Sequence, residues 1–157
     1  MALALTLASC RSSAPAALGT TAPDFTVNDG QKTVTLSQFR GRPVLLNFWA
    51  TWCPPCVQEM PALVALQQQV GNRVTILAVS MDQDEAAYKS FTAKNMPGML
   101  TVRDPDHKSS SVYGTFAYPE SFLIDKDGKI QRKFIGAVEW TSPEMLDYFK
   151  KLPCASC

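Results

Sequence analysis

The sequence is poor in several features that would point to particular classes of protein. It has a single histidine, His107, which stands among Asp, Lys and Ser residues and is expected to be a solvated loop side chain. No apolar run approaches the roughly 20 residues that a membrane-spanning helix needs. The 15 Lys and Arg residues balance 14 Asp and Glu residues, so the net charge is only +1. This charge gives no reason to expect a nucleic acid or an anionic membrane surface as partner.

The composition is that of an ordinary globular protein, with 46% hydrophobic and 18% charged residues among 157. Such a length fits one domain that buries enough core to fold unaided. Cysteine is the informative residue, because the chain has five, an odd number. They are Cys10, Cys53, Cys56, Cys154 and Cys157.

The stretch from Val44 to Pro61 organises the rest of the chain. It opens with an apolar run, V-L-L-N-F-W-A, which is typical of a buried central strand. After the cysteines, apolar residues recur at helical spacing. Cys53 and Cys56 therefore lie where a core strand passes into a helix. The two intervening prolines suit a first helical turn, whose amides have no partner within the helix.

This position predicts redox chemistry. The unpaired N–H groups and the dipole at a helix N-terminus favour a negative charge, so Cys53 is the expected thiolate. Cys56, one turn further along, is expected to be shielded, and the spacing allows a disulfide between the two. In the predicted cycle, Cys53 attacks the disulfide of a partner and Cys56 resolves the mixed disulfide.

The cysteines have other interpretations. Cys53 and Cys56 could be half of a zinc site, but the chain offers few further ligands and the prolines fit a helix start better. We therefore predict a redox pair, with no metal and no cofactor. Cys154 and Cys157 lack the strand-to-helix setting, so they are either a simple tail disulfide or a second pair that relays electrons.

The remaining pattern alternates strands with helices and favours a central sheet that is largely parallel. A hairpin is expected over residues 25–35, around the turn Asn28-Asp29-Gly30. The other expected elements are strands at 73–81, 99–102 and 122–124, helices at 84–95 and from Ser142 onward, and a hairpin turn at Asp127-Gly128.

Three segments together resemble the TlpA/ResA-like branch of thioredoxin-fold oxidoreductases. They are A-P-D-F at 22–25, the run at 36–56 that contains F-W-A-T-W-C-P-P-C, and Y-P-E-S-F-L-I-D-K-D-G-K-I at 118–130. Members of this branch are membrane-tethered or periplasmic thiol-disulfide proteins, several of which serve cytochrome c maturation. The resemblance implies a thioredoxin-like α/β fold, with a mixed central sheet flanked by helices and an N-terminal β-hairpin extension.

The resemblance also implies a substrate site. In this fold a cis proline faces the redox cysteines, and Pro119 matches it by motif. A cis bond here would present the backbone of Tyr118 to an extended substrate peptide, which pairs with it as an added strand. The expected substrate-binding residues are Trp52, Pro54, Tyr118 and Pro119. Trp49 and Trp52, which flank the motif, suggest a surface made for a partner.

A proton acceptor for the dithiol is expected at Glu120. Thioredoxins generally carry a buried aspartate six residues before the first cysteine, but this chain has Asn47 there. The family often places a glutamate directly after the cis proline instead, which is Glu120 here. Such a carboxylate could deprotonate Cys56 or tune Cys53. Glu59, in contrast, is expected to be a solvated surface carboxylate.

The N-terminus indicates export. The residues L-A-S-C that end at Cys10 resemble a lipoprotein cleavage box, so Cys10 is the expected lipidation site of a periplasmic, membrane-anchored protein. A cytoplasmic tail with a chance cysteine is the alternative. The expected division is a signal and flexible linker at 1–22, a thioredoxin-like domain at 23–152 and a cysteine-containing tail at 153–157.

The predicted function is thiol-disulfide exchange on protein partners, most simply as a monomeric reductase. Apocytochrome c is one candidate substrate, and a transmembrane thiol reductase is a candidate electron donor. Two other enzymes remain open: a disulfide-forming oxidase, and a peroxiredoxin-like peroxidase, which typically has threonine where Ala50 stands. A non-catalytic binding module would leave an intact dithiol unused.

Overall fold

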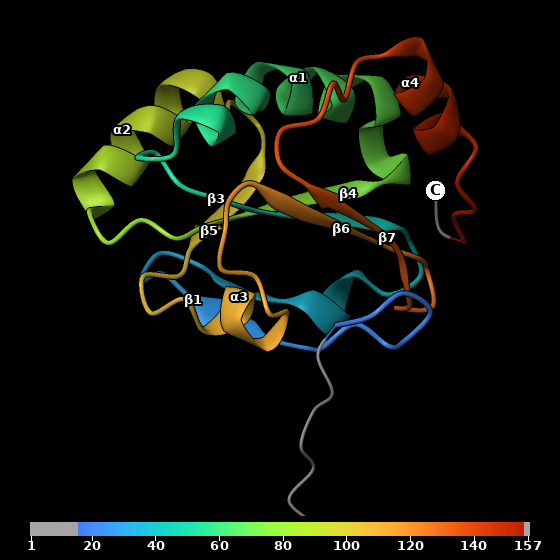
Figure 1. Ribbon diagram of the computed structural model, residues 1–157, viewed down its shortest axis with the longest axis horizontal. Helices are drawn as coiled ribbons and strands as arrows, with labels where there is room; N and C mark the ends of the chain where they lie inside the picture. Colours follow the sequence, from blue (N-terminus) through green and yellow to red (C-terminus); the bar gives the residue numbers. More distant parts are fainter. Residues whose placement is uncertain (1–15, 156–157) are drawn as a thin grey trace, which may run out of the picture.

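The computed structural model describes residues 16–155, which form a mixed five-stranded sheet between two layers (Figure 1). The strand order is β5-β4-β3-β6-β7, and a separate two-stranded sheet pairs β1 with β2. Helices α1, α2 and α4 cover one face, and α3 lies with the β1–β2 hairpin on the other (Figure 1).

The strands are β1 (Thr26–Asn28), β2 (Thr33–Thr35), β3 (Val44–Trp49), β4 (Thr75–Ser80), β5 (Leu100–Arg103), β6 (Glu120–Ile124) and β7 (Ile130–Ile135). The helices are α1 (Pro54–Val70), α2 (Glu85–Asn95), α3 (Lys108–Val112) and α4 (Pro143–Lys150), with short 3-10 turns at Leu36–Phe39 and Gly71–Arg73.

Strand β3 is the central strand, and every one of its residues is buried. It runs parallel to β4 and antiparallel to β6, so that Leu46 pairs with Leu77 on one side and with Phe122 on the other. A strand covered on both faces needs a continuous apolar run, which explains why this segment does not alternate with polar residues. The polar exception is Asn47, and it belongs to the site described below.

Capping side chains explain where two of the helices begin. Helix α2 begins after Asp84, whose side chain accepts a hydrogen bond from the Ala87 amide. Helix α4 begins after Ser142, which caps it in the same way, with Pro143 in the first turn. Both expected hairpins, at residues 25–35 and at Asp127-Gly128, are present. The fold class is the expected thioredoxin-like one.

Two expectations from the sequence are corrected. Residues 19–22 are not part of a free linker, because the Gly19 amide donates to the Ile130 carbonyl at 2.7 Å and the Ala22 amide donates to the Gly128 carbonyl at 2.9 Å. Trp49 offers no surface to a partner, since it is fully buried and packs on Tyr88 and Phe91 of α2.

An aromatic cluster fills the sheet face away from α1. Tyr113, which follows α3, packs edge-on against Phe25, Phe48 and Phe122. Its hydroxyl donates to the Pro23 carbonyl at 2.9 Å, so the ring also ties the start of the domain to the sheet. The side chain is 1% exposed. Burial of the ring therefore holds three separate segments of the chain together.

We expect Tyr113→Ala to lower the free energy of unfolding by about 3–5 kcal/mol, since it leaves a cavity in this cluster. Tyr113→Phe keeps the ring and removes only the hydroxyl, so it should cost about 1 kcal/mol. Urea unfolding of the two variants beside the parent protein measures both effects. Equal losses for the two variants would show that the ring packing contributes nothing.

Candidate active site

The two cysteines of the C-P-P-C motif form a disulfide at the N-terminus of α1. Cys53 is the N-cap residue, and its Sγ accepts a hydrogen bond from the Cys56 amide at 3.3 Å. Cys53 is 6% exposed whereas Cys56 is completely buried. Of the two sulfurs, only Cys53 is open to a partner, and it is also the one that the helix amides stabilise as an anion.

The Tyr118–Pro119 peptide bond is cis, as the resemblance implied, and it lies directly against the redox pair. The Tyr118 carbonyl oxygen is 3.4 Å from Cys53 Sγ. Trp52 is 59% exposed, and its ring meets that of Tyr118 edge-on with centroids 6.0 Å apart. Pro54 is exposed beside them in the first turn of α1. The structure thus brings together all four expected substrate-binding residues, although their binding role stays a prediction.

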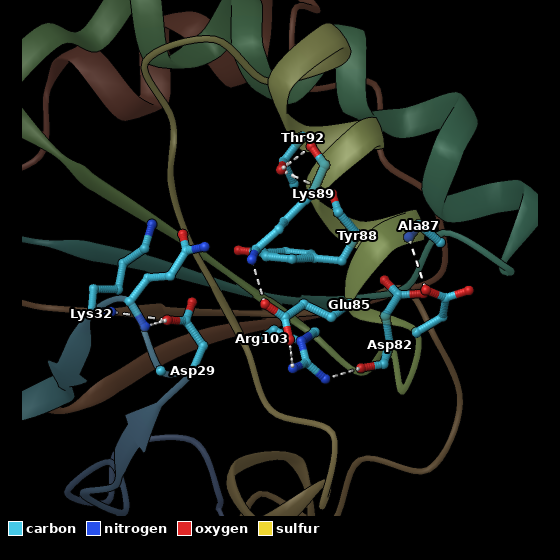
Figure 2. Close-up of polar contacts among 12 residues, drawn as sticks. Asp29, Lys32, Asp82, Glu85, Ala87, Tyr88, Lys89, Thr92 and Arg103 are labelled. Carbon is cyan, nitrogen blue, oxygen red and sulfur yellow. Dashed lines mark hydrogen bonds and ion pairs between the residues drawn. The ribbon is translucent and has the colours of Figure 1, made fainter.

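Asp82 anchors the loop that carries Cys53. Its carboxylate accepts hydrogen bonds from the Thr51 amide at 3.0 and 3.2 Å, and from the Thr51 hydroxyl. The guanidinium of Arg103 donates to the backbone carbonyl of Asp82 and pairs with Glu85 of α2 (Figure 2). Because Thr51 lies two residues before Cys53, this network fixes the entry of the chain into the active site.

His107 is more than a solvated loop residue, which corrects the expectation from the sequence. It is half-buried, it adopts a left-handed backbone with a φ of 57°, and its Nδ1 lies 3.4 Å from the Tyr118 hydroxyl. The same hydroxyl is 3.2 Å from the Ser110 hydroxyl. These two contacts hold the ring of Tyr118, the residue that precedes the cis proline. The local polar sequence around His107 gave no sign of them, because they join segments from different elements.

Glu59 is the buried carboxyl group that the sequence reasoning placed wrongly. It was expected at the surface, but it is 3% exposed, one helical turn after Cys56. Its Oε1 accepts hydrogen bonds from the indole Nε1 of Trp140 and from the Val138 amide. Burial raises the pKa of Glu59 to about 7, against the opposing effect of hydrogen bonds from Trp140, Val138 and Asn47. A carboxyl group with this pKa can exchange a proton near neutral pH.

A signal for Glu59 was present in the sequence. The buried face of α1 runs through Cys56, Met60 and Leu63, and Glu59 falls on it at the i+3 position from Cys56. Residues at this spacing are neighbours on a helix surface. The spacing alone therefore placed a carboxyl group beside the inner cysteine.

Glu120 is also buried, at 7% exposed, but in a different environment. One carboxylate oxygen lies 2.9 Å from Lys133 Nζ, and the other accepts from the Thr115 hydroxyl. In β6, Glu120 pairs with Phe48 while Ser121 pairs with Asn47. Since successive strand residues point to opposite faces, Glu120 lies on the sheet face away from Asn47 and Glu59. Its role as proton acceptor stays a prediction.

The remaining cysteines lie away from this site or outside the described residues. Cys154 is disulfide-bonded, and the neighbouring Ala155 amide donates to the Gly41 carbonyl at 3.0 Å. Gly41 precedes β3 whereas Cys53 follows it, so the six-residue strand separates them by roughly 20 Å. A relay between the two pairs would have to bridge this distance. Cys157 and the predicted lipidation site Cys10 lie outside residues 16–155.

Within residues 16–155, no group of three His, Cys, Asp or Glu side chains could hold a metal ion. The helices of the same range include none with the length and apolar character needed to cross a membrane.

Comparisons with known proteins agree on the type of chemistry. A family model described as Redoxin matches residues 17–149. The chain is 37% identical over 137 residues to the thiol-disulfide oxidoreductase ResA of Bacillus thuringiensis, covering 86% of this chain and 78% of the relative. It is 35% identical over 114 residues to the thiol:disulfide interchange protein DsbE of Pseudomonas aeruginosa, covering 72% and 62%. The solved exposed lipoprotein thioredoxin of Streptococcus pneumoniae superposes with a TM-score of 0.69 at 29% identity, covering 83% and 100%.

The raised pKa of Glu59 should make the stability of the protein depend on pH. Between the ordinary value of 4.5 and about 7, the folded state keeps a proton that the unfolded chain releases. The free energy of unfolding should therefore fall as pH rises across this window, by about 3 kcal/mol in total, and stay low above it.

Glu59→Gln should abolish this pH-dependent part of the free energy of unfolding, because glutamine cannot ionise. Urea unfolding at about pH 5 and about pH 8 tests it in the oxidised protein. The exposed Glu139→Gln is the matched control and should keep the pH dependence of the parent. If Glu59→Gln and the parent lose the same stability between the two pH values, Glu59 does not titrate in this window.

Proposed function

Because the chain belongs to the redoxin family and is a thiol-disulfide oxidoreductase, we propose that it reduces disulfides of extracytoplasmic proteins through Cys53 and Cys56. The observation that carries this proposal is the asymmetry of the pair. Cys53 caps the helix and touches the cis-proline loop, while Cys56 is completely buried. One sulfur can thus meet a partner, and the other can only meet the first sulfur.

In the first step, the Cys53 thiolate attacks one sulfur of the partner's disulfide. A bond forms between Cys53 and that sulfur, and the other partner sulfur leaves as a thiolate. The Cys56 amide, which donates to Cys53 Sγ, and the helix dipole stabilise the attacking anion. The exposed Trp52 and the backbone of Tyr118 support binding of an extended partner segment across Cys53.

In the second step, Cys56 loses its proton and attacks Cys53. The Cys53–Cys56 disulfide forms, and the second partner sulfur leaves as a thiolate that takes up a proton, so the partner gains two electrons and the enzyme is oxidised. We assign the proton acceptor for Cys56 to Glu59, because its carboxyl group is buried one helical turn away and titrates near neutral pH. The ion pair and hydrogen bond at Glu120 make that carboxylate the weaker candidate.

A role outside the cytoplasm is supported by the kind of relatives. DsbE of Pseudomonas aeruginosa is named as an interchange protein, and the pneumococcal relative is named as an exposed lipoprotein. We propose the same setting here, with a lipid on Cys10, electrons from a membrane thiol reductase, and apocytochrome c among the substrates. The direction of electron flow follows from the reduction potential, so a value near that of strong oxidants would select the oxidase instead.

Cys56→Ser should trap the partner, because the mixed disulfide on Cys53 can then no longer be resolved. We expect covalent adducts that dithiothreitol releases, and mass spectrometry of the released protein identifies the substrate. Cys53→Ser is the matched control and should form none. Adducts that form equally with Cys53→Ser, or not at all with Cys56→Ser, would reverse the assigned order of attack.

The proton acceptor is tested by the pH dependence of insulin disulfide reduction in the presence of dithiothreitol. In the parent protein the rate should rise as Glu59 ionises around the pKa of about 7. Glu59→Gln should lose this inflection and be slower by about 100-fold above it. Glu120→Gln should keep the inflection. A profile that changes with Glu120→Gln and not with Glu59→Gln would move the role to Glu120.

A further inference from the structure

His107 is the one residue within 16–155, apart from glycines, whose backbone is left-handed. Its φ is 57° and its ψ is 24°. A residue with a Cβ atom is less stable in this conformation than glycine, so a histidine held there needs a reason. Capping of α3 does not supply one, because the imidazole makes no capping hydrogen bond to that helix.

The turn that holds His107 is built from other groups. The His107 amide donates to the Asp104 carbonyl at 3.0 Å, and the Asp104 amide donates to the Ser80 carbonyl at 2.7 Å. The Asp104 carboxylate accepts from the Ser109 amide at 2.7 Å and from the Ser109 hydroxyl at 2.6 Å. None of these contacts uses an atom of the imidazole. Glycine at position 107 would therefore keep the turn and remove its backbone strain.

The imidazole contacts Tyr118, the residue before the cis proline. Its Nδ1 lies 3.4 Å from the Tyr118 hydroxyl, and the two rings meet edge-on with centroids 6.3 Å apart. The hydroxyl of Ser110, which is 1% exposed, lies 3.2 Å from the same Tyr118 oxygen. A tyrosine hydroxyl can donate to one of these neighbours and accept from the other, so the contacts persist whether or not Nδ1 carries a proton.

Tyr118 links this contact to the reactive sulfur. Its carbonyl oxygen is 3.4 Å from Cys53 Sγ, and its ring meets that of the exposed Trp52 edge-on. A Tyr118 ring that is fixed on the His107 side keeps these two contacts in one arrangement. A free ring would have to be ordered each time a partner binds, and this loss of conformational freedom would weaken binding.

We propose that His107 is a positioning residue for partner binding. The left-handed turn holds its imidazole against Tyr118, and together with Ser110 it fixes the Tyr118 ring. The Tyr118 backbone is then ready to pair with an extended polypeptide segment around the partner's disulfide. The inference rests on the proposed reduction of protein disulfides at Cys53. It follows that a disulfide within a polypeptide depends on His107, whereas a small disulfide without a peptide backbone does not.

The test compares insulin with hydroxyethyl disulfide, a small molecule without a peptide backbone, as oxidants of the reduced protein. His107→Gly should slow the reaction with insulin by about fivefold, as expected for one lost hydrogen bond, and that with hydroxyethyl disulfide by less than about twofold. Tyr118→Phe removes only the hydroxyl and should show the same pattern, and the double variant should be little slower than either. Lys108→Gln is the control and should match the parent, since Lys108 is exposed and pairs with Asp106.

Urea unfolding separates this role from a purely structural one. His107→Gly should be no less stable than the parent, because the turn keeps its hydrogen bonds and loses an unfavourable backbone conformation. A protein of equal or higher stability that is selectively slower with insulin supports the proposal. A parent-like rate with insulin, equal slowing with both disulfides, or a lower denaturation midpoint overturns it.

A spectroscopic measurement is independent of the rates. The chain has one histidine, so the ring signals of His107 in an NMR spectrum have a single assignment. These signals should show contacts to the Tyr118 ring and should shift in Tyr118→Phe. Absence of the contacts overturns the proposal whatever the rates are. The proposed function fails in a different way, which is that the parent protein reduces neither disulfide.

Discussion

The hydrogen bond from the Cys56 amide to Cys53 Sγ is the interaction on which the site depends. It exists because β3 ends at Trp49 and α1 begins at Pro54, which leaves Cys53 as the cap of a helix whose first amides are free. The remaining structure holds that cap in place. Asp82 fixes the preceding loop through Thr51, and the sheet positions the cis-proline loop on the other side of the sulfur.

The two buried glutamates show that the same type of side chain can have different properties on the two faces of one sheet. Glu120 has a lysine and a hydroxyl as partners, which satisfy it as an anion. Glu59 has an indole and an amide on one oxygen, and within residues 16–155 no cation shifts its pKa, so its ionised form is poorly stabilised. The proposed exchange needs a group that gives and takes a proton, and the less stabilised carboxylate suits that role better than the other.

Much of the fold was readable from the sequence, because its signals are local. The buried run of β3, the caps Asp84 and Ser142 and both hairpin turns depend on residues close together in the chain. The position of the cysteine pair followed from the strand-to-helix junction, and the cis bond at Pro119 followed from the resemblance.

What could not be read depends on contacts between distant segments. The spacing of Glu59 from Cys56 already put it on the buried face of α1, but its partners Trp140 and Val138 come from far along the chain and had no local signal. The sequence suggested that Trp49 faces a partner, but the structure shows it packed against Phe91 of α2. Residues 19–22 looked like a linker because their attachment is made by backbone groups, which carry no side-chain signature.

That attachment of residues 19–22 also fixes where the domain begins relative to the active site. They bond to the β6–β7 turn, at the end of β6 opposite to Glu120 and the cis proline. A tether upstream of residue 16 would therefore join the domain beside the end of the sheet opposite to Cys53. A protein held in this way would present its reactive sulfur outward, toward partners that approach from the surrounding medium rather than from the surface that holds it.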